Sequence, residues 1–155
     1  MNRVAIIVLA FAAVTAGCSP SAQRAGTSLS GVETPMPSDW RFTDATKEIQ
    51  IQVHTPYLIP HSVTIWCAQV DGTLYVGASA PQTKRWPGWV DSNPDVRLSI
   101  DGHIYPVRLV PLDAPDEIAL VRAAYATKYQ LDSNAGAAMG QVRYWRVAPR
   151  ETPSA

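Results

Sequence analysis

The side chains best suited to chemistry lie close together in one short stretch of the chain. This stretch supplies hydroxyl groups, two adjacent cations and two indole rings, at Ser79, Thr83, Lys84, Arg85, Trp86 and Trp89. Cations and hydroxyl donors together suit the binding of a phosphate, and aromatic walls suit a flat ring. If the protein has a binding site, we expect it here.

Elsewhere, the spacing of reactive residues predicts neither a metal site nor a nucleophilic centre. The histidines at positions 54, 61 and 103 do not have the spacing of metal ligands, so no metal ion is expected. Cys67 lies within an apolar run with no base placed to activate it, and we interpret it as a small buried hydrophobic residue. Paired carboxylates and a glycine-rich phosphate loop are also absent from the sequence.

Two predicted β-hairpins flank this stretch and must position it. Each is joined by an Asp-Gly pair, at Asp71-Gly72 and at Asp101-Gly102. Asp-Gly between apolar, β-branched runs favours a type I′ turn, because glycine tolerates the positive φ that this turn requires. The four strands are expected at residues 61–70, 73–79, 95–100 and 103–110.

The remaining pattern completes a mainly β domain. Residues 47–54 alternate strictly between apolar and polar, which predicts a half-buried strand, and residues 142–147 predict a closing strand. One helix is expected to begin at Asp113 as its cap, with Lys128 solvated and one apolar stripe packed on the sheet at Ile118, Val121, Tyr125 and Tyr129. The predicted fold class is mainly β with one helix (α+β), a six-stranded antiparallel split β-barrel.

The N-terminus is typical of an exported chain. An apolar run from Val4 to Val14 follows a positive head and is shorter than the roughly 20 residues that span a bilayer, so it predicts a signal peptide. Residues 15–18 resemble the bacterial lipobox, with Thr15 where that pattern usually has Leu. The resemblance implies cleavage before Cys18 and lipidation of Cys18, and Ser19 favours delivery to the outer membrane. An ordinary signal peptide cleaved nearby is the alternative.

Four segments follow from these patterns. We expect a signal peptide at residues 1–17, a lipidated flexible tether at 18–39, the barrel domain at 40–150 and a disordered tail at 151–155. The 13 basic and 13 acidic residues balance, which leaves no positive footprint for nucleic acid or for anionic lipid. Membrane attachment, on the extracytoplasmic side of the cell envelope, would therefore come from the lipid.

The order of strands, loop and helix resembles the split β-barrel flavin-binding superfamily, which includes the pyridoxamine-phosphate oxidase-like proteins and a deazaflavin-dependent nitroreductase branch. The resemblance covers roughly residues 61–150. It is carried by the segments Thr73–Ser79, Thr83-Lys84, Trp86–Trp89 and Ser92–Arg97, the last of which contains an Asn-Pro-Asp-Val step into a strand.

The resemblance implies a homodimer that binds FMN or a deazaflavin and acts as an oxidoreductase. Val63 and Thr64 would line the ring, and Trp86 and Trp89 would lie close to it. Ser79, Thr83 and Lys84 would hold the phosphate, with Arg85 nearby. FMN-binding members commonly carry Arg where this chain has His61, and a neutral imidazole is a weaker phosphate partner than a guanidinium group.

A cofactor-free barrel that serves as a binding or interaction module in the envelope is the alternative function. In that interpretation Lys84 and Arg85 are a solvated pair at a loop tip. Trp86 and Trp89 either fill the end of the barrel or form a partner surface with Tyr75.

The strands themselves also favour a dimer. Bulky aromatic residues are expected on the faces opposite the core rows, at Trp66, Tyr75, Tyr105, Tyr144 and Trp145. One helix covers only part of such a surface, so we expect a second copy of the chain to cover the rest.

Overall fold

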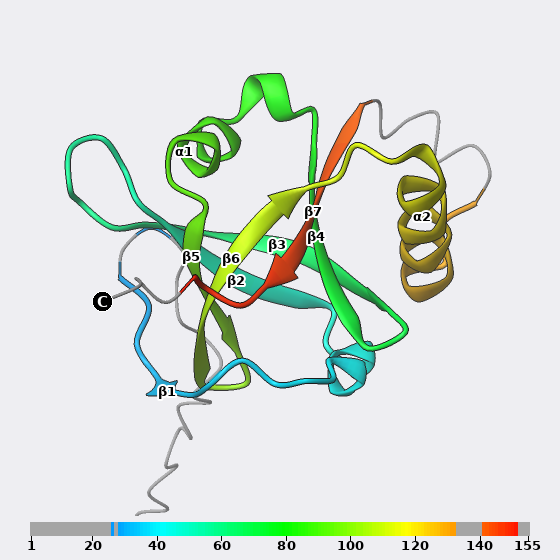
Figure 1. Cartoon of the computed structure of the whole chain (residues 1–155), viewed down its shortest axis with the longest axis horizontal. Helices are drawn as coiled ribbons and strands as arrows, with labels where there is room; N and C mark the ends of the chain where they lie inside the picture. Colours follow the sequence, from blue (N-terminus) through cyan, green and yellow to red (C-terminus); the bar gives the residue numbers. More distant parts are fainter. Residues whose placement is uncertain (1–25, 27, 133–140, 152–155) are drawn as a thin grey trace, which may run out of the picture.

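A computed structural model describes residue 26 and residues 28–132 and 141–151 of the chain (Figure 1). The predicted signal peptide, the lipidation site Cys18 and residues 152–155 of the predicted tail lie outside the described residues.

The six predicted antiparallel strands form a closed barrel. Around the barrel the order is β6-β5-β2-β3-β4-β7, and pairing between β7 and β6 completes the circle. The predicted fold class is therefore confirmed. The strands are β2 (Glu48–Val53), β3 (His61–Val70), β4 (Thr73–Ser79), β5 (Asp95–Ile100), β6 (His103–Pro111) and β7 (Val142–Ala148).

Both Asp-Gly pairs form the predicted hairpin turns. Asp71 and Asp101 each have φ of 49°, and the glycines that follow have φ of 82° and 81°. Positive φ at both central residues is the signature of the type I′ turn, whose twist matches that of the paired strands. The turns thus fix the registers of β3 with β4 and of β5 with β6.

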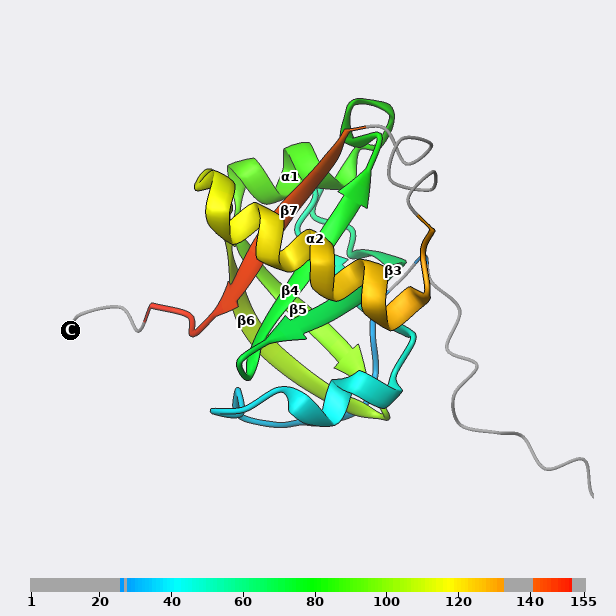
Figure 2. The same cartoon turned by 90° about the vertical axis from the view of Figure 1, so that its right-hand side faces the viewer.

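Helix α2 (Pro115–Tyr129) lies against the outside of the barrel, over β3 and β4 (Figure 2). Its predicted stripe is confirmed at Val121 and Tyr125, which are buried. Two expectations for this helix were wrong. The residue before it is Ala114, with no side-chain cap, so Asp113 does not cap the helix. Lys128 is not a solvated charge, because its ammonium group donates to backbone carbonyl oxygens of the barrel.

The stretch between the hairpins is more ordered than expected. It holds a 3-10 turn, η2 (Pro81–Thr83), and a second helix, α1 (Trp86–Ser92), where only a loop was predicted. The expectation of a single helix was therefore wrong. A helix of seven residues is too short to show helical periodicity, and its glycine has low helix propensity. Pro87 was the available signal, because proline fits the first turn of a helix.

The predicted tether begins to pack on the barrel well before residue 40. Leu29 is buried, and β1 (Val32–Glu33) runs parallel to the start of β6. Gly31 permits this approach, since a Cβ atom at that position would lie 2.5 Å from the carbonyl oxygen of Gly102. After a 3-10 turn, η1 (Arg41–Ala45), the chain enters β2. Residues 28–39 are therefore part of the domain, although their composition predicted a flexible segment.

Most of the aromatic residues expected on the outer surface are covered within one chain. Tyr75 and Tyr144 are buried in a cluster with α2. Tyr105 belongs to the barrel core, contrary to the expectation, and packs edge-on against Trp40, with ring centroids 5.2 Å apart. Trp145 points into the barrel and is fully buried, contrary to the expectation. Trp66 alone of this set remains exposed, at 39%. The strand aromatics thus give less support to a dimer than the sequence suggested.

The barrel changes its pairing where β3 leaves β2. Strand β3 pairs with β2 up to Trp66 and with β4 from Cys67 onward. Beyond this point the end of α2 lies between β3 and the residue before β2, and its side chains bond to both backbones. The amide of Cys67 donates to the Tyr129 hydroxyl at 3.0 Å, and that hydroxyl donates to the carbonyl oxygen of Lys47 at 2.6 Å. The Lys128 ammonium donates to the carbonyl oxygens of Thr43 and Cys67, at 2.9 and 2.8 Å.

Candidate ligand-binding cleft

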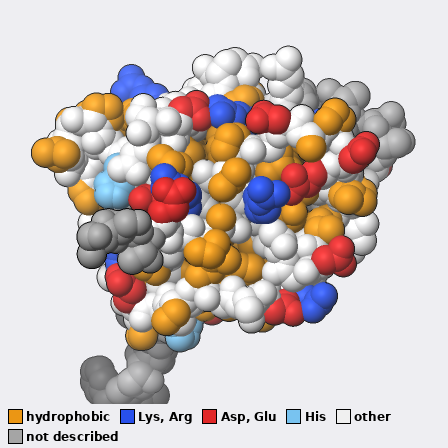
Figure 3. All heavy atoms as spheres, viewed as in Figure 1, with side chains coloured by type: hydrophobic (Ala, Val, Ile, Leu, Met, Phe, Trp, Pro, Cys, Tyr) orange, Lys and Arg blue, Asp and Glu red, His pale blue; other side chains and the backbone are white. Residues whose placement is uncertain are grey.

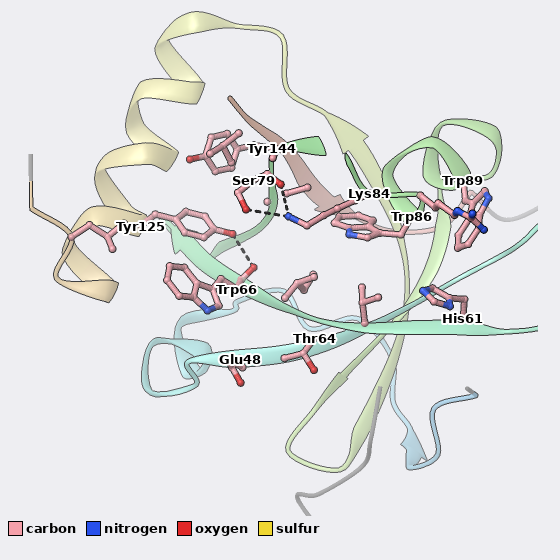
Figure 4. Close-up of a pocket in the computed structure, with 18 of the residues that line it drawn as sticks. Glu48, His61, Thr64, Trp66, Ser79, Lys84, Trp86, Trp89, Tyr125 and Tyr144 are labelled. Carbon is pink, nitrogen blue, oxygen red and sulfur yellow. Dashed lines mark hydrogen bonds between the residues drawn. The ribbon is translucent and has the colours of Figure 1, made fainter. Parts of the chain in front are cut away.

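A cleft of about 980 Å³ lies where β3, the end of β4, helix α1 and helix α2 meet (Figure 4). Its lining brings together eight of the nine cofactor-binding residues predicted from sequence. They are His61, Val63, Thr64, Ser79, Lys84, Arg85, Trp86 and Trp89. The ninth, Thr83, does not line the cleft, because its hydroxyl turns back and donates to the Ala80 carbonyl oxygen at 2.9 Å.

The cationic part of the cleft is built on the turn that follows β4. Ala80 adopts the left-handed conformation, with φ of 44°, and reverses the chain so that Lys84 returns to Ser79. The Lys84 ammonium donates to the Ser79 carbonyl oxygen and, at 3.1 Å, to its hydroxyl oxygen. Arg85 is exposed, and within the described part of the chain its guanidinium has no hydrogen-bond or ion-pair partner. It is therefore available to an anion that enters the cleft.

The two predicted tryptophans take different places. Trp86 is buried in the barrel core, with its ring 5.2 Å from that of Trp145, so it both closes the end of the barrel and forms a wall of the cleft. Trp89 is only partly buried and meets the His61 ring edge-on at 5.2 Å and the Tyr57 ring at 5.9 Å. Trp86 thus fills the end of the barrel, and Trp89 packs against the core beside it. Tyr75 lies in the buried cluster with α2, so it does not form a surface with the two indole rings.

Residues from α2 and β7 form the opposite end of the cleft, and they were not predicted as site residues. Tyr125 and Tyr144 lie at this end, near Trp66 (Figure 4), and Gly77 also lines the cleft. Gly77 was the usable signal: a Cβ atom there would lie 3.1 Å from two carbon atoms of the Tyr144 ring. A glycine inside a strand often marks such a close approach.

The electrostatics of the cleft favour binding over acid–base chemistry. Its lining carries two cations, Lys84 and Arg85, and one carboxylate, Glu48. Burial raises the pKa of Tyr125 well above its usual value, so the phenol stays neutral and donates to the Trp66 carbonyl oxygen at 3.0 Å. Among residues 26, 28–132 and 141–151, no three His, Cys, Asp or Glu side chains gather as metal ligands.

The donor set therefore fits a flat ring that carries a phosphate. Apolar side chains on β3 and β4 (Val63, Ile65 and Ala78) offer a wall to a ring, and the indole rings offer edges. An unpaired guanidinium and a lysine already held by a hydroxyl group lie on the neighbouring turn, where a phosphate would find donors. His61 is occupied by its contact with Trp89, which places it on the aromatic side of the cleft.

Solved structures with the same fold have diverse descriptions. A FAD-binding protein from Mesorhizobium loti is 15% identical, with a TM-score of 0.52, over 70% of this chain and 82% of its own. An F420-H2 dependent reductase is 12% identical, with a TM-score of 0.53, over 66% and 94%. HutZ, a heme storage protein from Vibrio cholerae, is 12% identical, with a TM-score of 0.52, over 72% and 87%.

Other matched structures extend this picture. One is described as a domain-swapped dimer, at 13% identity and a TM-score of 0.53, over 66% of this chain and 80% of its own. Two are longer proteins, of which this chain spans 49% and 50%. At these identities the likeness shows the split β-barrel fold. No curated protein matches the sequence. Residues 41–146 match the model of a family described as uncharacterized proteins conserved in bacteria, DUF2255, and since the match covers more than half of the chain, the protein belongs to that family.

Proposed function

We propose that the cleft binds a flavin or deazaflavin nucleotide and that the protein is an oxidoreductase-like domain. The observation that carries this proposal is the meeting, in one cleft, of an apolar wall, indole rings and an unpaired guanidinium. The descriptions of related split barrels as FAD-binding and as F420-H2 dependent add support from proteins of the same fold.

The residues have separate parts in this proposal. Arg85 and Lys84 hold the phosphate, and Ser79 orients Lys84 through its hydroxyl and carbonyl oxygen atoms. Val63 and Thr64 lie along the ring, while Trp86 and Trp89 exclude water from its edge. A bound flavin or deazaflavin would supply hydride transfer, a chemistry that protein side chains lack. Tyr125 and Tyr144 bound the space left for a substrate.

A spectroscopic titration tests the proposal. The purified mature protein is titrated with FMN, with F420 and with hemin, and absorbance and fluorescence report binding. Replacing Arg85 with Ala should weaken flavin or deazaflavin binding by about tenfold, the value of one charge-assisted hydrogen bond at an exposed site. Arg41→Ala is the matched control: it removes an equal charge from η1, where Arg41 pairs with Asp39 outside the cleft.

The outcomes are distinct. Binding of FMN or F420 that weakens only in the Arg85 variant supports the proposal. Binding of hemin alone would show that the cleft takes a heme and not a flavin or deazaflavin, and would contradict the proposal. If none of the three chromophores binds, the cofactor-free interaction module is the better description.

The homodimer belongs to the same proposal. Trp66 lies at the edge of the cleft and is the exposed member of the strand aromatics, so a partner that covers it would also close the site. Light scattering at micromolar concentration should give the mass of two chains. A monomer mass in the presence of the bound cofactor would contradict a site completed by two copies.

Attachment to the envelope through a lipid on Cys18 is the final part of the proposal. No helix within the described residues is long and apolar enough to cross a membrane. Metabolic labelling with a fatty-acid analogue should mark the protein, and Cys18→Ser should abolish both the label and the retention of the chain in the membrane fraction. A labelled Cys18→Ser variant would show that the lipid lies elsewhere.

A further inference from the structure

We propose that the loop between β2 and β3 contacts the lipid surface. In this arrangement Leu58 and Ile59, with Tyr57 beside them, rest in the boundary between headgroups and acyl chains. This inference depends on the proposed lipid anchor at Cys18, because the anchor brings the loop to the bilayer.

The loop presents three large apolar side chains to solvent in succession. Tyr57, Leu58 and Ile59 are 54%, 92% and 64% exposed, and Pro56 and Pro60 flank them. The loop projects at the left of the molecule in Figure 1, and hydrophobic side chains appear at the same edge in Figure 3. Single exposed apolar residues are ordinary, but three in sequence on a projecting tip indicate a surface that meets something apolar.

Hydrogen bonds preset the shape of the loop. The Thr55 hydroxyl donates to the carbonyl oxygen of Ile59 at 2.7 Å, and the amide of Leu58 donates to the carbonyl oxygen of Thr55 at 3.2 Å. Leu58 has φ of 61°, the left-handed conformation, which places its side chain at the tip. Little ordering entropy remains to be lost when such a loop inserts.

The size and polarity of the tip favour a bilayer over a folded protein as the occupant. Three side chains are far fewer than the 20–30 residues a side of a typical stable protein interface, which buries about 800 Å² per partner. Residues 52–61 contain no carboxylate, and neither does the lining of the second cavity, which lies under the loop and is bounded by Trp89. Because these residues carry no negative charge, anionic headgroups do not repel them. Tyr57 and Trp89 are the residue types that favour the headgroup level.

The path of the chain puts the anchor within reach. The amide of Gly26 donates to the Ser62 hydroxyl at 2.9 Å, so the chain joins the barrel near the start of β3. Gly26 is eight positions after Cys18, which allows a reach of less than about 30 Å. Leu58 lies four residues before Ser62, no further than roughly 14 Å along the chain. A lipid on Cys18 can therefore lie in the bilayer while the loop touches its surface.

Depth-sensitive labelling of the anchored protein tests the inference. Leu58→Cys is labelled with an environment-sensitive nitrobenzoxadiazole dye in the full lipidated chain, which is reconstituted into vesicles of phosphatidylethanolamine and phosphatidylglycerol. Leu120→Cys is the matched control: Leu120 is 60% exposed and lies on α2, at the other side of the barrel from the loop (Figure 1). Cys67 is fully buried and stays unlabelled in the folded protein.

The label at position 58 should become several-fold brighter and shift to shorter wavelength when vesicles are present, and nitroxide lipids should quench it. The label at position 120 should not change. A position-58 label that stays in water on protein retained by vesicles would overturn the inference while leaving the anchor intact. Protein that does not float with vesicles at all would overturn both. A spectral shift without vesicles would assign the loop to a protein interface instead.

Discussion

Replacing Tyr129 with Phe should destabilise the barrel at the point where β3 changes partner. The ring would be kept, including its stacking on Trp66 with centroids 4.2 Å apart and planes within 8°. Only the hydroxyl would be lost. That hydroxyl accepts a hydrogen bond from the Cys67 amide and donates one to the Lys47 carbonyl oxygen.

The size of this destabilisation depends on which hydrogen-bond partners remain for each group once the hydroxyl is removed. Lys47 is exposed, so water can replace the hydroxyl at its carbonyl group. The carbonyl group of Cys67 retains the Lys128 ammonium at 2.8 Å. The amide of fully buried Cys67 loses its acceptor and finds no other acceptor among these groups, and an unsatisfied buried N–H group costs about 1–3 kcal/mol. We therefore expect the free energy of unfolding to fall by about that amount.

Urea unfolding followed by far-UV circular dichroism and tryptophan fluorescence measures this change. Tyr57→Phe is the matched control, since Tyr57 is 54% exposed and its hydroxyl lies outside the barrel. A surface change of this kind should stay within about 0.5 kcal/mol. If the two variants lose the same stability, the Tyr129 hydroxyl does not supply the hydrogen bond that β2 fails to make with β3, and the reasoning is wrong.

The remaining predictions concern pH and packing. Burial raises the pKa of Tyr129 to about 12, above its usual 10. The stability that its neutral hydroxyl contributes is therefore complete below pH 10 and is lost as pH rises toward 12, so the difference in the free energy of unfolding between wild type and Tyr129→Phe should shrink over that range in urea unfolding. Gly77→Ala should destabilise the domain, because crowding against the Tyr144 ring costs about 1–3 kcal/mol while the entropic gain is about 0.4–1 kcal/mol; a raised melting temperature would contradict this. Lys128→Met should cost about 2 kcal/mol through two lost charge-assisted hydrogen bonds, whereas Lys47→Met, which removes an exposed ammonium, should be nearly neutral.

The parts of the fold that were predictable from sequence are those set by local rules. Asp71-Gly72 and Asp101-Gly102 fixed both hairpins, because few other pairs adopt positive φ twice in succession. The strict alternation before His54 fixed β2, because one face of that strand is buried. The location of the cleft followed as well, since two hairpins place the ends of the stretch between them near the same end of the barrel.

The unpredicted parts depend on contacts between distant residues. Lys128 is polar and near a helix end, which predicted solvation, yet its ammonium group donates to carbonyl oxygens of Thr43 in η1 and Cys67 in β3. Leu29 and Gly31 gave no periodic signal, because they lie outside regular structure and precede β1, a strand of only two residues. Tyr125 belonged to a recognised core stripe, and only the three-dimensional arrangement shows that the same ring also bounds the cleft.

The place of β7 in the barrel has a consequence for the order of folding. This strand is the last element in the described part of the chain, yet it pairs with both β4 and β6 and so completes the circle of strands. Until residues 142–148 are free, β4 and β6 each keep an unpaired edge, and the barrel stays open. A chain still being synthesised therefore cannot close the barrel early. The barrel therefore closes only after the residues of β7 have emerged.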